Sequence, residues 1–182
     1  MDRFSAYLLV RRHLKRPRSR NQALAVEAIM EELAALLDQP REAWGVLGLL
    51  SQMDLEYADQ NPRARGQTAS QQARLEGLDE AAARHLERWC RRLSPEPEAA
   101  PAHALEPVEH ALLLATLLAE EALEARARDH ETLSAQDLDL RRQRGDVLGD
   151  GIDAALSELR LPVRAAAELA ERAVARIAQD LR

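Results

Sequence analysis

The side chains best suited to catalysis or metal binding in this 182-residue chain are five histidines, one cysteine and several serines. No two histidines lie four residues apart and none belongs to an HExxH pattern, so the sequence carries no helical zinc motif of the usual kind. We interpret them as surface or helix-capping residues. They are His13, His85, His103, His110 and His130.

Three further features fall short of a recognisable site. The single cysteine, Cys90, excludes an internal disulfide and a CxxC-type metal site, and we expect it to be half-buried in a helix. Ser51 lacks the GxSxG frame of an activated nucleophile. The glycine-rich segment Gly145–Gly151 lacks the Lys and Ser/Thr of a phosphate-binding loop, so it predicts a helix-breaking connection. We therefore predict no catalytic residue, no metal ligand and no cofactor.

The densest charge feature is the segment 11–20, which holds five arginines, Lys15 and His13 in a chain of net charge −6. Such a patch can bind phosphate groups despite the overall negative charge. No aromatic residues are interleaved for base stacking, and part of the segment falls where a helix is expected to end, which favours cations anyway. Nucleic-acid or anion binding through this segment therefore stays an alternative function.

The composition favours a single helical domain over residues 1–182. Hydrophobic residues make up 46% of the chain and aromatic residues 3%, and no segment alternates apolar and polar residues as a strand would. No apolar run approaches the roughly 20 residues of a membrane span, and the first residues lack the pattern of a signal peptide. We expect a cytoplasmic protein without a membrane partner.

Helical periodicity predicts an all-α bundle of about eight helices, interrupted by a Pro-rich internal linker at 94–107. The first helix is expected from Asp2 to a stop at Pro17, and a short helix near 152–159 follows glycines that punctuate the chain. Gly45 and Gly48 predict close packing by a neighbouring helix. The remaining helices are expected at 21–37, 41–53, 68–76, 79–93, 108–128 and 162–181.

Three segments carry a family resemblance. Asn21–Met30 is similar to the pattern H-x-L-A-V-E-A-x-M, Trp44–Tyr57 to W-x-x-x-G-L-L-H-D-x-D-x-E, and Asn61–Gly66 to a P-x-x-H-G loop. In this order and spacing they resemble the HD-domain metal-dependent phosphohydrolases, in their small single-domain branch. The resemblance implies a helical bundle around one or two divalent metal ions that activate water against a phosphoester.

The chain departs from this family at the positions where the resemblance implies metal ligands. Neutral amide and hydroxyl groups, an arginine and a tryptophan replace the histidines and aspartates, and such groups hold a divalent ion poorly. Asp54 and Glu56 remain, outside the primary ligand set. We therefore predict an inactive, pseudoenzyme-like member that binds a small anion or a protein partner, with a divergent hydrolase of phosphoesters or nucleotides as the alternative. The replaced positions are Gln22, Ser51, Gln52, Arg65, Trp89 and Thr116.

These six side chains are expected to converge in a vestigial pocket without an ion, because neutral groups avoid burying unpaired charge. Arg65 is expected to take the cationic role of the metal and is the candidate anion-binding residue, while Trp89 fills part of the volume. The alanine-rich face of the final helix, around Ala166 and Ala170, allows either packing within a monomer or formation of a homodimer.

Overall fold

The computed structural model describes residues 1–58, 64–90, 105–128, 132–143 and 147–180. Throughout these residues the regular structure is helical, which confirms the all-α prediction. The helices are α1 (Arg3–His13), α2 (Pro17–Leu36), α3 (Arg41–Ser51), α4 (Leu55–Ala58), α5 (Gln67–Leu75), α6 (Glu80–Arg88), α7 (Pro107–Ala127), α8 (Ala135–Arg142), α9 (Val147–Glu158) and α10 (Val163–Asp180).

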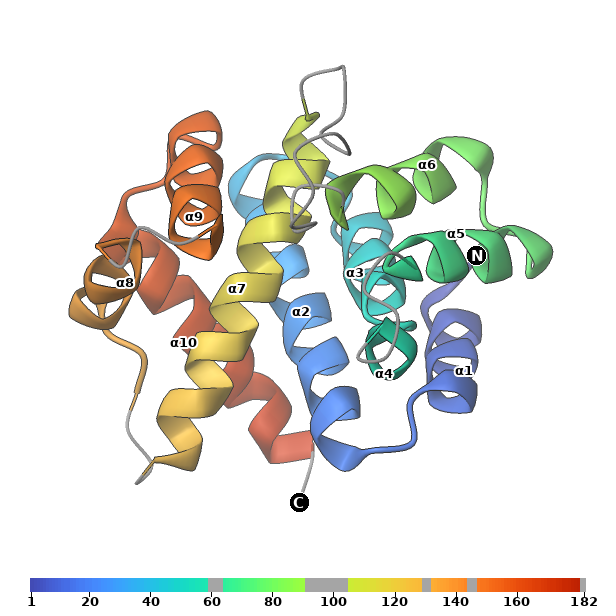
Figure 1. Ribbon diagram of the computed structural model, residues 1–182, viewed down its shortest axis with the longest axis horizontal. Coiled ribbons are helices and arrows are strands. Elements are labelled where there is room, and N and C mark those ends of the chain that lie inside the picture. The colour runs from blue at the N-terminus through green and yellow to red at the C-terminus, as the bar shows by residue number, and fades with distance from the viewer. Residues whose placement is uncertain (59–63, 91–104, 129–131, 144–146, 181–182) are drawn as a thin grey trace.

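Two long helices, α2 and α7, run through the middle of the bundle (Figure 1). Helices α8, α9 and α10 lie on one side of this pair, and α1 and α3 to α6 lie on the other. The core is continuous across both sides, because α2 packs on α3, α7 and α10. Residues near position 50 and residues near position 116 are thereby brought together inside the molecule.

The closest packing joins α2 to α3 and depends on two glycines. A Cβ on Gly45 would lie 2.9 Å from Cγ of Glu31, and one on Gly48 would lie 3.0 Å from the carbonyl oxygen of Val26. The prediction of a close helix approach at these glycines is confirmed. This approach draws the end of α3, with Ser51, into the centre of the bundle, where it is fully buried.

Helix starts follow the capping signals, with two corrections at prolines. Asp2 caps α1 and Asp79 caps α6, each accepting a hydrogen bond from a backbone N–H of the first turn. Pro17 begins α2 rather than only ending α1, and Pro107 belongs to α7 rather than to the linker. Both prolines occupy the first helical turn, where the missing N–H costs nothing.

The C-terminal third differs most from the prediction. Helix α9 begins at Val147, so Gly149 and Gly151 lie within it instead of preceding it. A Cβ at Gly151 would make only ordinary contacts, at 3.5 Å from a methyl carbon of Leu113, so nothing forces the helix to break there. Helices α4 and α8 were not predicted, because α4 is a single turn and α8 buries only Leu138 along its length.

The alanine-rich face of α10 is buried within the chain itself. Ala166 and Ala170 are inaccessible to solvent and belong to the core that α10 forms with α2, α7 and α8. This face therefore offers no surface to a second copy and no longer favours a homodimer. The predicted linker residues 94–104 and the loop residues 59–63, with His103 and His130, lie outside the described residues.

Candidate functional site

A buried cluster held by hydrogen bonds, an ion pair and a cation–π contact lies where the end of α3 packs against α7, and we call it the Gln52 cluster. Its members are Ser51, Gln52, Asp54, Arg65, Trp89 and Thr116. The Gln52 side-chain amide donates to the hydroxyl oxygens of Ser51, at 2.9 Å, and Thr116, at 3.0 Å. Ser51 in turn donates to the backbone carbonyl of Gly48 at 2.7 Å. Both amide hydrogens of Gln52 are thus used within the protein.

Arg65 closes the network on its other side. Its Nη2 donates to Oε1 of Gln52 at 2.8 Å, so the buried glutamine is satisfied at its oxygen as well. The guanidinium lies over Trp89, with Cζ 5.7 Å from the ring centroid, and Trp89 is inaccessible to solvent. The side chain of Arg65 is 13% exposed. It faces the carboxylate of Asp54, which opposes the approach of an additional anion.

Asp54 anchors the loop that carries Arg65. Its Oδ2 accepts hydrogen bonds from the backbone N–H groups of Gly66, at 2.7 Å, and Ala69, at 3.1 Å, in the first turn of α5. Its Oδ1 is buried without a hydrogen-bond partner and lies 3.7 Å from Nε of Arg65. Burial raises the pKa of Asp54 above its ordinary value, and the nearby Arg65 charge only partly opposes this shift.

The structure brings together five of the six side chains expected in the vestigial pocket. Gln22 is the exception: it is half-buried on α2 and forms no hydrogen bond with the described members of the cluster. The cluster presents amide and hydroxyl groups around one fixed ion pair, Arg65 with Asp54. Such a set supplies one carboxylate to a metal, and an arginine already faces that carboxylate.

A second feature is an open pocket of about 680 Å³ between the start of α3, α6, the start of α7 and the end of α9. Its walls are mostly apolar, and Trp44 forms part of them. Its polar lining comes from a few side chains. They are Gln39, Asp79, His85, Glu106, Glu158 and Arg160.

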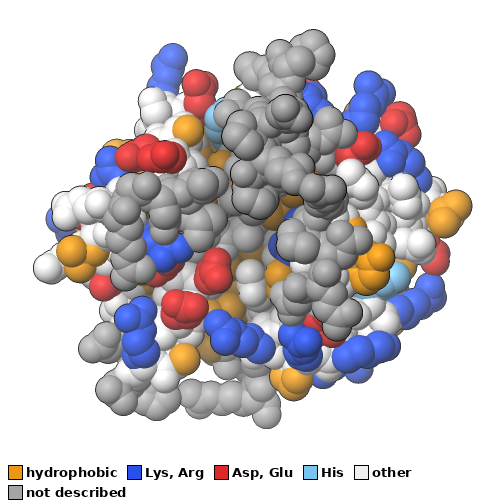
Figure 2. Space-filling view, viewed as in Figure 1, with side chains coloured by type: hydrophobic (Ala, Val, Ile, Leu, Met, Phe, Trp, Pro, Cys, Tyr) orange, Lys and Arg blue, Asp and Glu red, His pale blue; other side chains and the backbone are white. Residues whose placement is uncertain are grey.

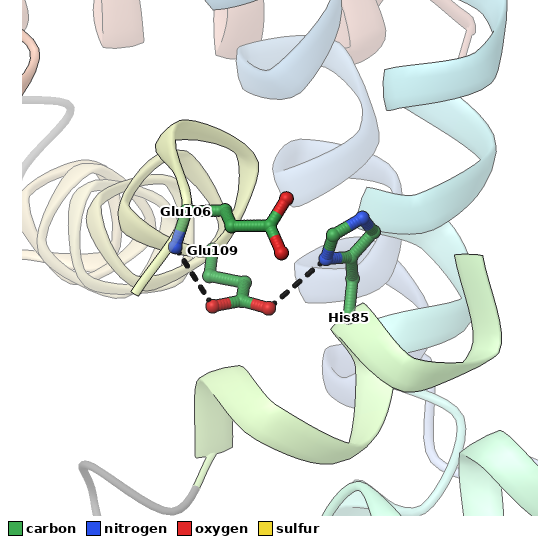
Figure 3. A group of neighbouring side chains, drawn as sticks. All are labelled: His85, Glu106 and Glu109. Carbon is green, nitrogen blue, oxygen red and sulfur yellow. Dashed lines mark hydrogen bonds and ion pairs between the residues drawn. The ribbon is translucent and has the colours of Figure 1, made fainter. Parts of the chain in front are cut away.

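Three side chains that can hold a metal meet at the edge of this pocket (Figure 3). His85 projects from α6 toward Glu106 and Glu109, which lie one turn apart at the start of α7. His85 was predicted to be a surface or capping residue, but its Nδ1 lies 2.9 Å from Oε1 of the fully buried Glu109. The sequence signal was weak, because the two residues lie 24 positions apart with the Pro-rich segment between them.

The basic segment 11–20 lies on the surface, where α1 meets α2. In the view of Figure 1 and Figure 2, the meeting point of α1 and α2 is at the lower right, and Lys and Arg side chains lie along that edge of the molecule. Part of their charge is balanced locally, because Arg12 pairs with Glu76 and Arg18 with Glu124. The carboxylate of Glu56 also accepts backbone N–H groups of the segment. The segment is therefore tied to acidic residues along its length.

Cys90 is buried at the end of α6, next to the Arg65 loop. Its thiol donates a hydrogen bond to the backbone carbonyl of Arg65 at 2.9 Å. This hydrogen bond helps to hold the loop that carries Arg65 in place.

Within the described residues, no helix combines the length and the apolar character needed to cross a bilayer. Compared with known proteins, the chain matches no protein-family model, no curated protein and no solved structure.

Proposed function

We propose that this chain is a non-catalytic, HD-domain-like protein that works by binding a ligand and not by hydrolysing a phosphoester. The observation that carries the proposal is the position of Arg65. Its guanidinium contacts Gln52 and stacks on Trp89, at two positions where the family resemblance implies metal ligands, and it also faces Asp54. A fixed cation in this position replaces the positive charge and the volume that a metal ion would otherwise supply, which supports the proposal.

Ligand binding is better supported at the pocket beside Trp44 than at Arg65. Preformed pockets of a few hundred Å³ with apolar walls and few polar groups are typical small-molecule sites. This pocket has about 680 Å³ and fits that description, whereas the guanidinium of Arg65 is engaged by Gln52. The proposed ligand is a small molecule with an apolar body.

Catalysis is tested by incubating the purified protein with phosphomonoesters and nucleotides in the presence of Mn²⁺, Mg²⁺ or Ni²⁺. We expect no turnover above that of a Gln52→Ala variant, because the cluster lacks the ligands to hold an attacking water on a metal. Inorganic phosphate at millimolar concentration should also leave the melting temperature unchanged. Metal-dependent turnover that Gln52→Ala abolishes would establish the alternative, a divergent hydrolase.

Pocket binding is tested by tryptophan fluorescence, because Trp44 and Trp89 are the two tryptophans of the chain. In a Trp89→Phe background, the emission of Trp44 should shift saturably with n-octanol, a neutral apolar probe. Ala43→Phe, at the pocket wall, should abolish the shift, and Ala175→Phe, on an exposed face of α10, should preserve it. The pocket assignment would be refuted if octanol did not shift the emission of Trp44, or if the shift were equal in Ala43→Phe and Ala175→Phe.

A further inference from the structure

The polar edge of the pocket has the ligand set of a transition-metal site. One ligand atom each from His85, Glu106 and Glu109 all lie within 4.8 Å of one another. Around a zinc ion with ligand distances of about 2.1 Å, neighbouring ligand atoms are about 3.4 Å apart. Small side-chain rotations would therefore bring the three atoms to bonding distance. The imidazole and the two carboxylates are also ligand types that zinc prefers.

The start of α7 holds the two carboxylates in a suitable orientation. Glu109 is fully buried, and its Oε2 accepts the backbone N–H of Glu106 at 2.9 Å. This bond turns its other oxygen toward His85, as Figure 3 shows. Glu106 is half-exposed, and its carboxylate accepts the backbone N–H of Glu109 in a capping box and pairs with Arg88. The two carboxylates are thus held next to the same imidazole.

Arg88 acts on this cluster as a partner of both carboxylates. Its Nη1 lies 3.0 Å from Oε1 of Glu106 and 3.3 Å from Oε1 of Glu109. These contacts fall on Oε1 of both carboxylates, so a metal ion bound to those oxygens would have to displace the guanidinium of Arg88. Two glutamates against one arginine also leave one negative charge for a cation to balance.

We propose that His85, Glu106 and Glu109 bind one zinc ion, with its fourth position open to the pocket. His85 and Glu106 line that pocket, so the ion would face its apolar walls. Three protein ligands with one open position can also coordinate a donor group of a bound molecule. This inference shares no residue with the Gln52 cluster and holds whether or not the proposed non-catalytic function is correct.

The test is titration of chelator-treated protein with Zn²⁺ by calorimetry, and with Co²⁺ by its visible absorption, which reports nitrogen and oxygen ligands directly. We expect one equivalent of either ion to bind, and Mg²⁺ not to compete. His85→Ala should weaken Zn²⁺ binding by about 100-fold or more, because loss of an outer partner alone commonly costs about 10- to 100-fold. His13→Ala, which removes an exposed histidine of α1, is the matched control and should have no effect.

Arg88→Met should leave Zn²⁺ binding intact or tighten it, because the competing charge is removed, and circular dichroism checks that each variant is folded. The proposal is overturned if one equivalent of Zn²⁺ does not bind, or if His85→Ala binds it as tightly as the His13→Ala control. Metal binding that survives His85→Ala but is lost in Asp54→Asn would instead place the ion at the Gln52 cluster. That result would refute this zinc site, whereas the non-catalytic function is tested separately by the turnover assay.

Discussion

The guanidinium of Arg65 donates from Nη2 to Oε1 of Gln52 at 2.8 Å, and this bond joins the loop before α5 to the end of α3. The side-chain amide of Gln52 donates its two hydrogens to Ser51 and Thr116. The bond from Arg65 therefore satisfies the remaining polar atom of the side chain, its oxygen. A buried amide with every polar atom paired stabilises the fold, whereas an unpaired one destabilises it. The cluster is therefore an integral part of the core.

Removing the charge of Arg65 should destabilise the fold, because Asp54 then stays buried without a facing cation. Arg65→Met is expected to lower the free energy of unfolding by about 3 kcal/mol, because the carboxylate, 1% exposed, loses its facing cation. Asp54→Asn should recover part of this loss in the double variant. Urea unfolding of both single variants and the double variant measures the coupling, and additive effects would show that the pair does not interact.

The Thr116 hydroxyl should contribute to stability through its hydrogen bond with Gln52. Thr116→Val keeps the shape but leaves one amide hydrogen of Gln52 without an acceptor, and we expect a loss of about 1 kcal/mol. Thr116→Ser retains the oxygen and should lose clearly less stability. Chemical denaturation of both variants provides the measurement, and equal losses would mean that packing of the methyl group dominates.

Gly66 should tolerate no side chain. Its φ is +74°, and a Cβ would meet Sγ of Cys90 and lie 2.5 Å from the carbonyl oxygen of Leu86. Gly66→Ala therefore combines backbone strain with overpacking, and we expect a loss of about 3 kcal/mol or more.

Gly77 offers the matched control for this variant. Its φ is +90°, but a Cβ there would meet nothing within 4 Å. Gly77→Ala should thus show the strain alone, about 1 kcal/mol. Thermal melting of both variants separates the two effects, and similar shifts would show that the clash at Gly66 relaxes away.

Glu56 should make the α1–α2 corner sensitive to acid. Burial tends to raise its pKa, but hydrogen bonds from the backbone N–H groups of Arg16, at 2.7 Å, and Lys15, at 3.0 Å, outweigh burial and lower the pKa below the ordinary value of 4.5. The ionised form is thus favoured in the folded state. Its stabilisation is complete above the ordinary pKa and is lost as the pH falls through the lowered folded value.

The comparison of wild type with Glu56→Gln over pH 3 to 7 tests this expectation. Wild type should be more stable by about 1 kcal/mol near pH 6, after allowance for solvent screening of a partly exposed group. The difference should vanish in acid, where Glu56 is protonated and resembles glutamine. A difference that stays constant with pH would show that the charge of Glu56 is not involved.

Local patterns were sufficient to predict most helices of the first two thirds of the chain. The apolar spacing over 21–37 predicted α2, and Gly45 and Gly48 predicted its close contact with α3. The glycines of α9 misled the prediction, because Gly151 sits in a helix stabilised by packing on α7 rather than by its own propensity. Tertiary packing outweighed the local preference there.

The sequence by itself determined the all-α fold and the residue types at the positions where the family resemblance implies metal ligands, since both depend on residue type and spacing. Only the tertiary structure decided that Arg65 contacts Gln52, that Gln22 stays apart, and that His85 meets Glu109. These contacts join residues on different helices, so the packing of α3, α6 and α7 sets their distances. Helical periodicity indicates which face of a helix is buried, but it does not specify which side chains will meet there.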